Sequence, residues 1–258
     1  MVRMGLMGLA LSGLVAGAAQ AADPAPTVRI DSGVLQGAAV TPAIVSFKNI
    51  PYAKPPVGSL RWAPPQRPDR WSEPRDATAF GASCPQPGGS GPLDGSAKGP
   101  QSEDCLTLNI CAPVGAKGAP VMLWIHGGSN TQGGASIPYY DGSAFARDGV
   151  VLVSINYRLG ALGFFAHPAI TKASGARAPL GNYGLMDQVA ALQWVKRNIA
   201  AFGGDPKAVT VFGESAGGQD ILLLLGNHSA EGLFKQAVVE SGGGWDAPPP
   251  LATREAQG

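Results

Sequence analysis

The feature that most constrains this chain is a glycine-rich pentapeptide at residues 213–217, Gly-Glu-Ser-Ala-Gly, with Ser215 at its centre. A short apolar run, residues 209–212, precedes it, and a second apolar run, residues 221–225, follows it with helical character. Strand, Gly-x-Ser-x-Gly and helix in this order predict a nucleophile elbow, a sharp turn that lifts the serine hydroxyl toward a substrate. The backbone N–H of Ala216, at the start of the helix, would then point to the place where an oxyanion forms.

A second glycine-rich segment follows the apolar run at residues 121–125. There His126 precedes Gly127, Gly128 and Ser129, at the place where folds with a nucleophile elbow contribute further oxyanion N–H groups. Glycine is needed in such a turn because a side chain would block the approach of the backbone to the substrate oxygen. Since His126 directly precedes the turn, we predict that it packs and orients the turn and does not serve as the base.

The spacing of apolar residues predicts a layered α/β domain. Three β-rich apolar runs occupy residues 121–125, 150–157 and 209–212, and residues 237–239 would form the next strand. Between the second and third runs, apolar residues recur at helical spacing at Leu185, Val189, Leu192, Val195 and Ile199. Continuous apolar strands alternating with amphipathic helices predict a mostly parallel central sheet with helices on both faces.

The first hundred residues have a different character. Short alternating segments within residues 24–50 predict an N-terminal antiparallel meander. Residues 51–100 contain too much proline and glycine for regular structure, and we predict an arm wrapped around the body. Trp62 and Trp71 would fix this arm by burying their rings.

The first residues are typical of a secretory signal. A charged start containing Arg3 leads into an uncharged apolar stretch and ends in Ala19-Gln20-Ala21, a small-x-small cleavage site. The apolar stretch is shorter than the roughly 20 residues of a spanning helix, so we expect no membrane anchor. We predict cleavage near Ala21 and a secreted or periplasmic protein, in which residues 22–258 form the N-terminal part of a single, truncated α/β domain.

The three cysteines agree with export to an oxidising compartment, where one pair could form and one thiol remain. Cys105 and Cys111 would lie on one strand and not face each other, whereas Cys84 and Cys105 bracket a Gly/Ser-rich loop that a disulfide could tie. Cys111 is interpreted as a small strand residue.

The charge balance argues against large anionic partners. Loss of residues 1–21 removes Arg3 and no acidic residue, which leaves equal numbers of basic and acidic side chains. A neutral chain without charge clusters gives no reason to expect nucleic acid or an anionic membrane as a partner. Three scattered histidines and no clustered carboxylates suggest no metal site, and no cofactor is expected.

Several longer motifs extend the pattern around Ser215, and together they resemble the N-terminal half of a type-B carboxylesterase. This family includes secreted bacterial esterases, animal carboxylesterases and cholinesterases. The similarity covers about residues 24–245, and the matching segments are residues 202–206, 209–218 and 102–109, with further landmarks at 50–53, 60–62, 156–158, 181–188 and 240–242.

The resemblance implies an α/β-hydrolase fold and hydrolysis of a small-molecule carboxylic ester through an acyl-enzyme. Ser129 departs from the family, which usually has a glycine or alanine there, but its N–H is still available. The residues to which the resemblance assigns roles are Ser215 as nucleophile, the N–H groups of Gly128, Ser129 and Ala216 as oxyanion hole, and Cys84 with Cys105 as a disulfide.

Family members run to about twice this length and carry the triad acid and histidine in the other half. We therefore expect this chain to lack C-terminal strands and to need a C-terminal half, because a serine without a positioned base is a weak nucleophile. Glu214 is not expected to be the triad acid, and His167 and His228 are expected to be loop residues.

Two alternatives to an enzyme stay open. One is a non-catalytic, hydrolase-like binding protein, known in this family as adhesion ectodomains, and the other is a defective truncated product. The intact elbow around Ser215 argues against the binding protein, since a binding module has no use for a strained turn.

Overall fold

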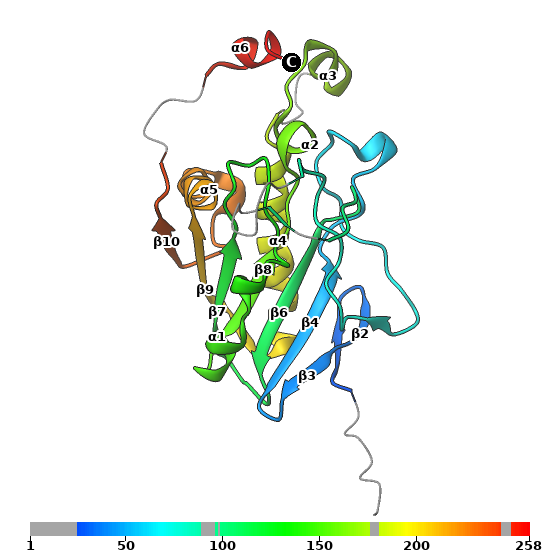
Figure 1. Ribbon diagram of the computed structural model, residues 1–258, viewed down its shortest axis with the longest axis vertical. Coiled ribbons are helices and arrows are strands. Elements are labelled where there is room, and N and C mark those ends of the chain that lie inside the picture. The colour runs from blue at the N-terminus through cyan, green and yellow to red at the C-terminus, as the bar shows by residue number, and fades with distance from the viewer. Residues whose placement is uncertain (1–24, 89–95, 98, 176–180, 244–248) are drawn as a thin grey trace, which may run out of the picture.

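The computed structural model describes residues 25–88, 96–97, 99–175, 181–243 and 249–258 (Figure 1). The predicted secretory signal, residues 1–21, lies outside this range, so its cleavage remains a prediction. Within the described ranges, none of the helices combines the length and the apolar character that crossing a membrane requires.

Short strands and helices alternate along the chain. The strands are β1 (Thr27–Ile30), β2 (Gly33–Gln36), β3 (Ala38–Thr41), β4 (Ile44–Pro51), β5 (Arg75–Asp76), β6 (Thr107–Pro113), β7 (Ala119–Ile125), β8 (Val151–Ile155), β9 (Gly204–Glu214) and β10 (Gln236–Glu240). The α-helices are α1 (Ser143–Arg147), α2 (Gly160–Phe164), α3 (Pro168–Ser174), α4 (Tyr183–Asn198), α5 (Ala216–Leu225) and α6 (Leu251–Glu255). Single 3₁₀ turns occupy Gly58–Leu60, Pro138–Tyr140, Ile199–Phe202 and His228–Ala230.

The central sheet has seven strands in the order β10-β9-β7-β8-β6-β4-β3. Strands β10, β9, β7 and β8 run parallel, as predicted, whereas β8, β6, β4 and β3 pair antiparallel. The antiparallel pairing of β3 with β4 agrees with the meander predicted for residues 24–50, whereas the antiparallel direction of β6 was not predicted. Connection length gives one physical reason for the β3–β4 pairing, because only Pro42 and Ala43 join β3 to β4, too few residues for the crossover that a parallel pair requires.

The predicted N-terminal meander is divided between two sheets. β1 and β2 pair antiparallel in a separate three-stranded sheet of order β1-β2-β5, while β3 and β4 extend the central sheet. The small sheet is covered by Trp71, whose indole Nε1 donates to the Val34 carbonyl at 2.9 Å. A Cβ at Gly33 would lie 2.3 Å from that nitrogen, so glycine is required for the indole to approach the strand.

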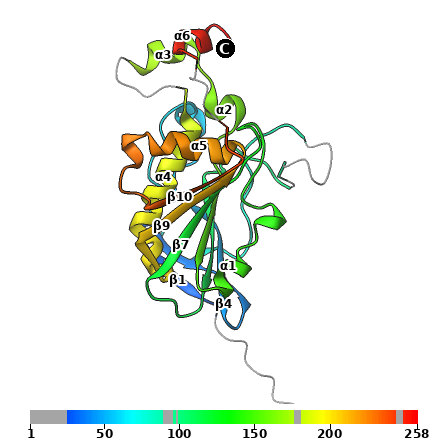
Figure 2. The ribbon, with the colours of Figure 1, turned by 90° about the vertical axis from the view of Figure 1, so that its left-hand side faces the viewer.

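Helices cover both faces of the central sheet, as predicted (Figure 2). Leu123 and Ile125 of β7 join the larger core cluster, together with apolar residues of α4 and α5. Trp124 points to the opposite face and packs against Phe212, which in turn contacts Phe145 of α1. This alternation along β7 is the two-residue period of a strand that is buried on both sides.

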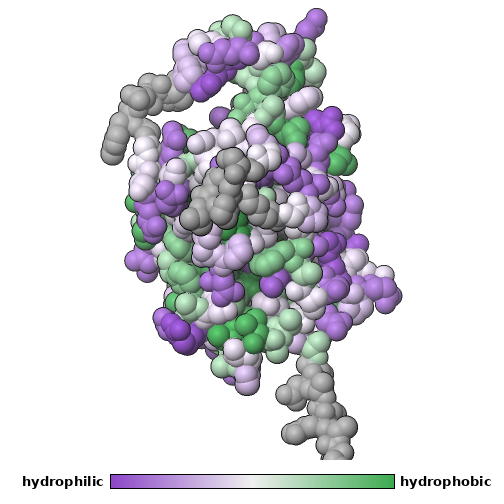
Figure 3. Space-filling model, viewed as in Figure 1, coloured by the Kyte–Doolittle hydropathy of each residue, from purple (hydrophilic) through white to green (hydrophobic). Residues whose placement is uncertain are grey.

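Helix α4 forms where the apolar residues recur at helical spacing, and it buries Val189, Leu192, Trp194 and Val195 against the sheet. Apolar surface remains at scattered exposed positions. Figure 3 shows several separate hydrophobic areas among hydrophilic ones on the face seen in Figure 1.

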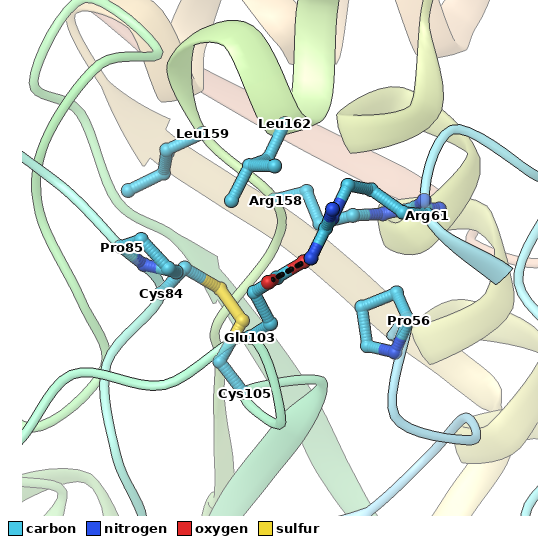
Figure 4. A pocket seen from close by; sticks show the side chains of 9 residues that line it. All are labelled: Pro56, Arg61, Cys84, Pro85, Glu103, Cys105, Arg158, Leu159 and Leu162. Carbon is cyan, nitrogen blue, oxygen red and sulfur yellow. Dashed lines mark hydrogen bonds and ion pairs between the residues drawn. A yellow bond between two sulfur atoms is a disulfide. The ribbon is translucent and has the colours of Figure 1, made fainter. Parts of the chain in front are cut away.

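The proline-rich arm is attached to the body through polar and covalent contacts as well as apolar ones (Figure 4). Arg61 Nε and Nη2 donate to the two carboxylate oxygens of Glu103 at 2.7 and 2.5 Å, beside the disulfide between Cys84 and Cys105. Trp62 and Trp71 are half-buried, so the prediction holds in part: Trp71 packs against the main core and Trp62 against Phe165, but neither is fully buried. The backbone of Trp62 adopts a positive φ of 54°, and its indole donates to the Ala161 carbonyl at 2.8 Å.

The cysteine positions differ in one respect from the expectation. β6 begins at Thr107, so Cys105 lies before the strand and is free to turn toward Cys84. Cys111 lies within β6 and is buried and unpaired, as a small strand residue. Burial raises the pKa of the Cys111 thiol to about 11, which leaves it protonated at neutral pH.

A buried ion pair joins α4 to the loop after β8. Arg158 donates to Asp187 from its backbone N–H at 3.0 Å, from Nε at 2.8 Å and from Nη2 at 2.7 Å. The two side chains are only 3% and 0% exposed. Burial raises the pKa of Asp187, and the hydrogen bonds from Arg158 act in the opposite direction. Each charge is therefore tolerated only because the other is present.

We predict that Asp187→Ala lowers the free energy of unfolding by about 3–5 kcal/mol, because Arg158 would remain buried without a partner. Urea unfolding at pH 7, followed by tryptophan fluorescence, measures this loss. Asp148→Ala is the matched control, since the Asp148 pair with Arg147 is 66% and 70% exposed, and it should cost less than about 0.5 kcal/mol. A loss for Asp187→Ala no larger than that of the control would contradict the prediction.

Candidate active site

Ser215 occupies a sharp turn between the last residue of β9 and the first residue of α5. Its dihedral angles, φ 54° and ψ −119°, are unfavourable for a residue with a side chain. Such a conformation costs on the order of 1–3 kcal/mol and persists only where the surroundings enforce it. Here the Ser215 N–H donates to the Glu240 carbonyl of β10 at 2.8 Å, and the Ser215 carbonyl accepts from Gln219 N–H at 2.9 Å.

Close backbone packing beneath the turn explains the small residues around Ser215. A Cβ on Gly217 would lie 2.1 Å from the Ile125 carbonyl oxygen, which is far inside contact distance. The first helical turn of α5 can therefore lie directly against the end of β7 only because residue 217 has no side chain. At the first position of α5, the Ala216 N–H has no acceptor within the helix.

The segment after β7, residues 126–130, forms a second tight turn beside the first, and we call it the oxyanion turn. A Cβ on Gly127 would lie 2.7 Å from the Glu214 carbonyl oxygen and 3.2 Å from Ser215 Cβ, so this backbone touches the elbow. Gly128, Ser129 and Asn130 all have positive φ, at 101°, 55° and 57°. In the described part of the chain, the N–H groups of Gly128 and Ser129 have no protein acceptor.

The structure thus brings together the residues that the sequence assigned to one site. Ser215 is half-buried, and the oxyanion turn and the start of α5 border it. Ser129 is exposed, and it lines a cleft next to the elbow together with Asn130, Asn182, Gln219 and Asp220.

Of the other residues considered as acid or base, Glu214 directly precedes Ser215, whereas His167 and His228 lie in other segments. Glu214 is exposed on the elbow. His167 caps α3, where its Nδ1 accepts from Ala169 N–H at 3.1 Å, and the side chain of His228 is fully exposed in a 3₁₀ turn. Among the described residues, no imidazole donates to or accepts from Ser215, and no group of three or more metal-ligating side chains is present.

The sequence profile of the "Carboxylesterase family" matches residues 24–249, most of the chain. The chain belongs to the carboxylesterase family.

Two relatives with known names are esterases. The fumonisin B1 esterase of Sphingopyxis macrogoltabida is 48% identical over 228 residues, which are 88% of this chain and 41% of that protein. The para-nitrobenzyl esterase of Bacillus subtilis is 50% identical over 198 residues, covering 76% of this chain and 40% of that protein. This carboxylesterase-family chain therefore spans less than half the length of these relatives.

Solved structures confirm the predicted α/β-hydrolase fold. A structure of PNB esterase superposes with a TM-score of 0.77 at 46% identity, covering 84% of this chain and 44% of that one. The carboxylesterase of Geobacillus stearothermophilus superposes with a TM-score of 0.72 at 45% identity, covering 82% and 43%.

His126 in this carboxylesterase-family chain is a buried packing residue, 1% exposed and stacked on Tyr157 at 4.5 Å. Its Nδ1 lies 2.8 Å from the Gly127 carbonyl, an acceptor, so Nδ1 carries the hydrogen. Burial lowers the pKa of His126 to about 4, although the hydrogen bond to Gly127 acts in the other direction. His126 is thus neutral at pH 7.

The sequence did not predict a polar network beneath the oxyanion turn. Asp220 of α5 accepts side-chain hydrogen bonds from Asn130 and Gln188. The Asn130 side chain in turn accepts one from the Tyr157 hydroxyl. The available signal was a single acidic residue, Asp220, placed directly before the apolar run of that helix.

We predict that Ser215→Gly is more stable than Ser215→Ala by about 1 kcal/mol, because glycine adopts the observed dihedral angles without strain while alanine does not. Urea unfolding of both variants under one buffer measures the difference. If Ser215→Gly proves the less stable of the two, the backbone at this position is not strained.

His126 should make stability depend on pH. Because its pKa is lower in the folded protein than in the unfolded chain, the unfolded state binds the proton first, and stability is lost as pH falls from about 6.5 to 4. His126→Phe keeps a ring on Tyr157 and removes the titration. We expect the wild type to lose about 3 kcal/mol relative to His126→Phe between pH 7 and 4. Urea unfolding at a series of pH values measures this, and parallel pH curves for the two proteins would contradict it.

Proposed function

We propose that the protein to which this chain belongs hydrolyses small-molecule carboxylic esters through an acyl-enzyme formed on Ser215. The observation that carries the proposal is the contact between two strained turns. Ser215 lies at φ 54°, and the backbone of Gly127 packs against it and is followed by two unpaired N–H groups. A nucleophile beside fixed N–H donors is the arrangement that acyl transfer requires.

In this mechanism the Ser215 Oγ forms a bond to the ester carbonyl carbon, and its proton passes to a base. The carbonyl oxygen becomes an oxyanion, which would accept hydrogen bonds from the N–H groups of Gly128, Ser129 and Ala216. Collapse of this intermediate breaks the bond to the alcohol oxygen, and the base returns the proton to the leaving alcohol. Water then attacks the acyl group by the same route and regenerates Ser215.

We infer that the base and its acid partner come from a C-terminal half, because no imidazole among the described residues forms a hydrogen bond with Ser215. His126 is excluded because its ring is buried, carries its hydrogen on Nδ1 toward Gly127 and stacks on Tyr157. This inference follows the family resemblance, in which the triad acid and histidine lie in the C-terminal half. In a serine protease that uses the same kind of catalytic triad, loss of the histidine lowers turnover by roughly 10⁶-fold. We therefore expect the chain alone to be nearly inactive.

The edge of the central sheet supports the need for a C-terminal half. β10 pairs on one side with β9, and its Val238 and Val239 are 42% and 36% exposed. Leu223 and Leu225 of α5 are also exposed, at 45% and 58%. A sheet edge with apolar side chains is a natural site for additional strands. We propose that further strands extend the sheet here and bring the base to Ser215.

The predicted leader and the disulfide support export. A bond between Cys84 and Cys105 persists in an oxidising compartment, which agrees with a secreted or periplasmic location.

The test is ester hydrolysis by the chain alone and by the chain mixed with the C-terminal half of the Bacillus subtilis para-nitrobenzyl esterase. With p-nitrophenyl acetate, we expect activity only in the mixture and its loss of at least about 10³-fold in Ser215→Ala. Ser229→Ala, at an exposed serine, is the control and should leave the rate unchanged. Equal activity of Ser215→Ala and wild type would exclude Ser215 as the nucleophile. A soluble chain that stays inactive with its partner would favour a binding protein, and aggregation would favour a defective product.

A further inference from the structure

We propose that Asp220 is a positioning residue that fixes the oxyanion turn to helix α5 through the side chain of Asn130. Its importance for catalysis rests on the proposed function of Ser215, while the contact itself can be tested without any ester. The proposal assigns a role to a carboxylate that the acyl-transfer mechanism above does not use.

Asp220 lies in the second turn of the helix that Ser215 precedes, and it is 1% exposed. Its Oδ1 accepts from Asn130 Nδ2 at 3.0 Å, and its Oδ2 accepts from Gln188 Nε2 of α4 at 2.6 Å. In the described ranges, neither lysine nor arginine pairs with this carboxylate. Neutral amides therefore provide its stabilisation, from α4 on one side and from the oxyanion turn on the other.

Asn130 is the residue through which this contact reaches the oxyanion N–H groups. It directly follows Ser129, and both residues have positive φ, which non-glycine residues rarely adopt. The Tyr157 hydroxyl lies 3.0 Å from Asn130 Oδ1 and 2.8 Å from the His126 carbonyl oxygen, so it can donate its hydrogen to either. The Asn130 carbonyl also accepts from Gly160 N–H at 2.7 Å. Asn130 is thus held at its side-chain amide, its side-chain oxygen and its backbone.

A carboxylate suits this position better than a neutral side chain. Two N–H donors from two different elements meet there, and an ionised aspartate accepts from both. An asparagine would direct its own NH₂ group toward one of the donors. A protonated aspartate would likewise present an O–H to one of them. With the two amides oriented as observed, the ionised form of Asp220 is the form that accepts both hydrogen bonds.

Burial raises the pKa of Asp220 to about 6, and the hydrogen bonds from Asn130 and Gln188 act in the opposite direction. Tyr157 is the titratable side chain that faces this group, and burial raises its pKa well above the ordinary value, so it stays neutral. Above about pH 6 the Asp220 carboxylate accepts both hydrogen bonds, and below about pH 6 its protonation removes one of them. The oxyanion turn should then loosen in mild acid.

The consequence for the proposed reaction is a preorganised oxyanion site at neutral pH. N–H donors assist acyl transfer only when they are already at the position of the developing charge. Ser129 is adjacent to Asn130 in sequence, so a shift of Asn130 would move the Ser129 N–H relative to Ser215. Asp220 acts on this geometry through Asn130, since its carboxylate is buried and bonds to the Asn130 side chain.

The deciding experiment is a pH titration of the full chain by NMR, with ¹³C-labelled aspartate carboxyls and ¹⁵N amides. We expect the Asp220 carboxyl to titrate near pH 6, and the Asn130 side-chain NH₂ and Ser129 backbone N–H signals to shift with the same midpoint. If the Asn130 and Ser129 signals stay fixed while Asp220 titrates, or if Asp220 titrates at its ordinary pKa, the proposal is overturned.

Two variants test the contact from its two ends. Asp220→Asn should abolish the shared midpoint and raise the hydrogen-exchange rate of the Asn130 side-chain NH₂ by about tenfold or more. Asn130→Gly preserves the positive φ and should raise the Asp220 pKa, because a hydrogen bond that favours the charged form is lost. Asp148→Asn makes the same chemical change at an exposed site and should alter none of these signals.

The outcomes remain decisive if a variant does not fold. The wild-type titration needs no substitution, and Asn130→Gly leaves Asp220 and Gln188 in place. Since no ester is used, a negative result here would leave the nucleophile assignment of Ser215 standing. A negative hydrolysis assay would equally leave the Asp220 contact intact.

Discussion

The close approach of β7 and β9 at their carboxyl ends is the constraint on which the site depends. The two strands are parallel neighbours, with Ile125 opposite Gly213, and each strand leads into a tight turn just beyond that pair. The Ile125 carbonyl occupies the space that a Cβ on Gly217 would need. Two backbones can come this close only where side chains are absent, so glycine on both turns places Ser215 beside the oxyanion turn.

Buried polar side chains of α4 hold the segments around the elbow in place. Asp187 of α4 neutralises Arg158 after β8, and Gln188, its neighbour, donates to Asp220 of α5. Two successive residues of one helix thus tie down two different loops around the elbow. Buried polar groups of this kind cost free energy unless every partner is in place, which makes the geometry sharply defined once the fold has formed.

Much of this arrangement could be predicted from residue order. Apolar runs located β7, β8, β9 and β10, and the spacing of apolar residues located α4. The antiparallel direction of β6 was missed because an apolar pattern identifies a strand but does not indicate its direction. The Asp220 contact was missed for another reason: its partners Asn130 and Gln188 lie 90 and 32 residues away in sequence.

By itself, the sequence determined the local conformations of the site. Gly-Glu-Ser-Ala-Gly between an apolar run and a helix requires a sharp turn, and small residues after β7 permit a second one, because local sterics govern both. The tertiary structure decided which of these turns meet, which histidine is buried and which carboxylate faces an asparagine. These are properties of packing between distant segments, where desolvation and hydrogen-bond partners are set by the fold and not by neighbours along the chain.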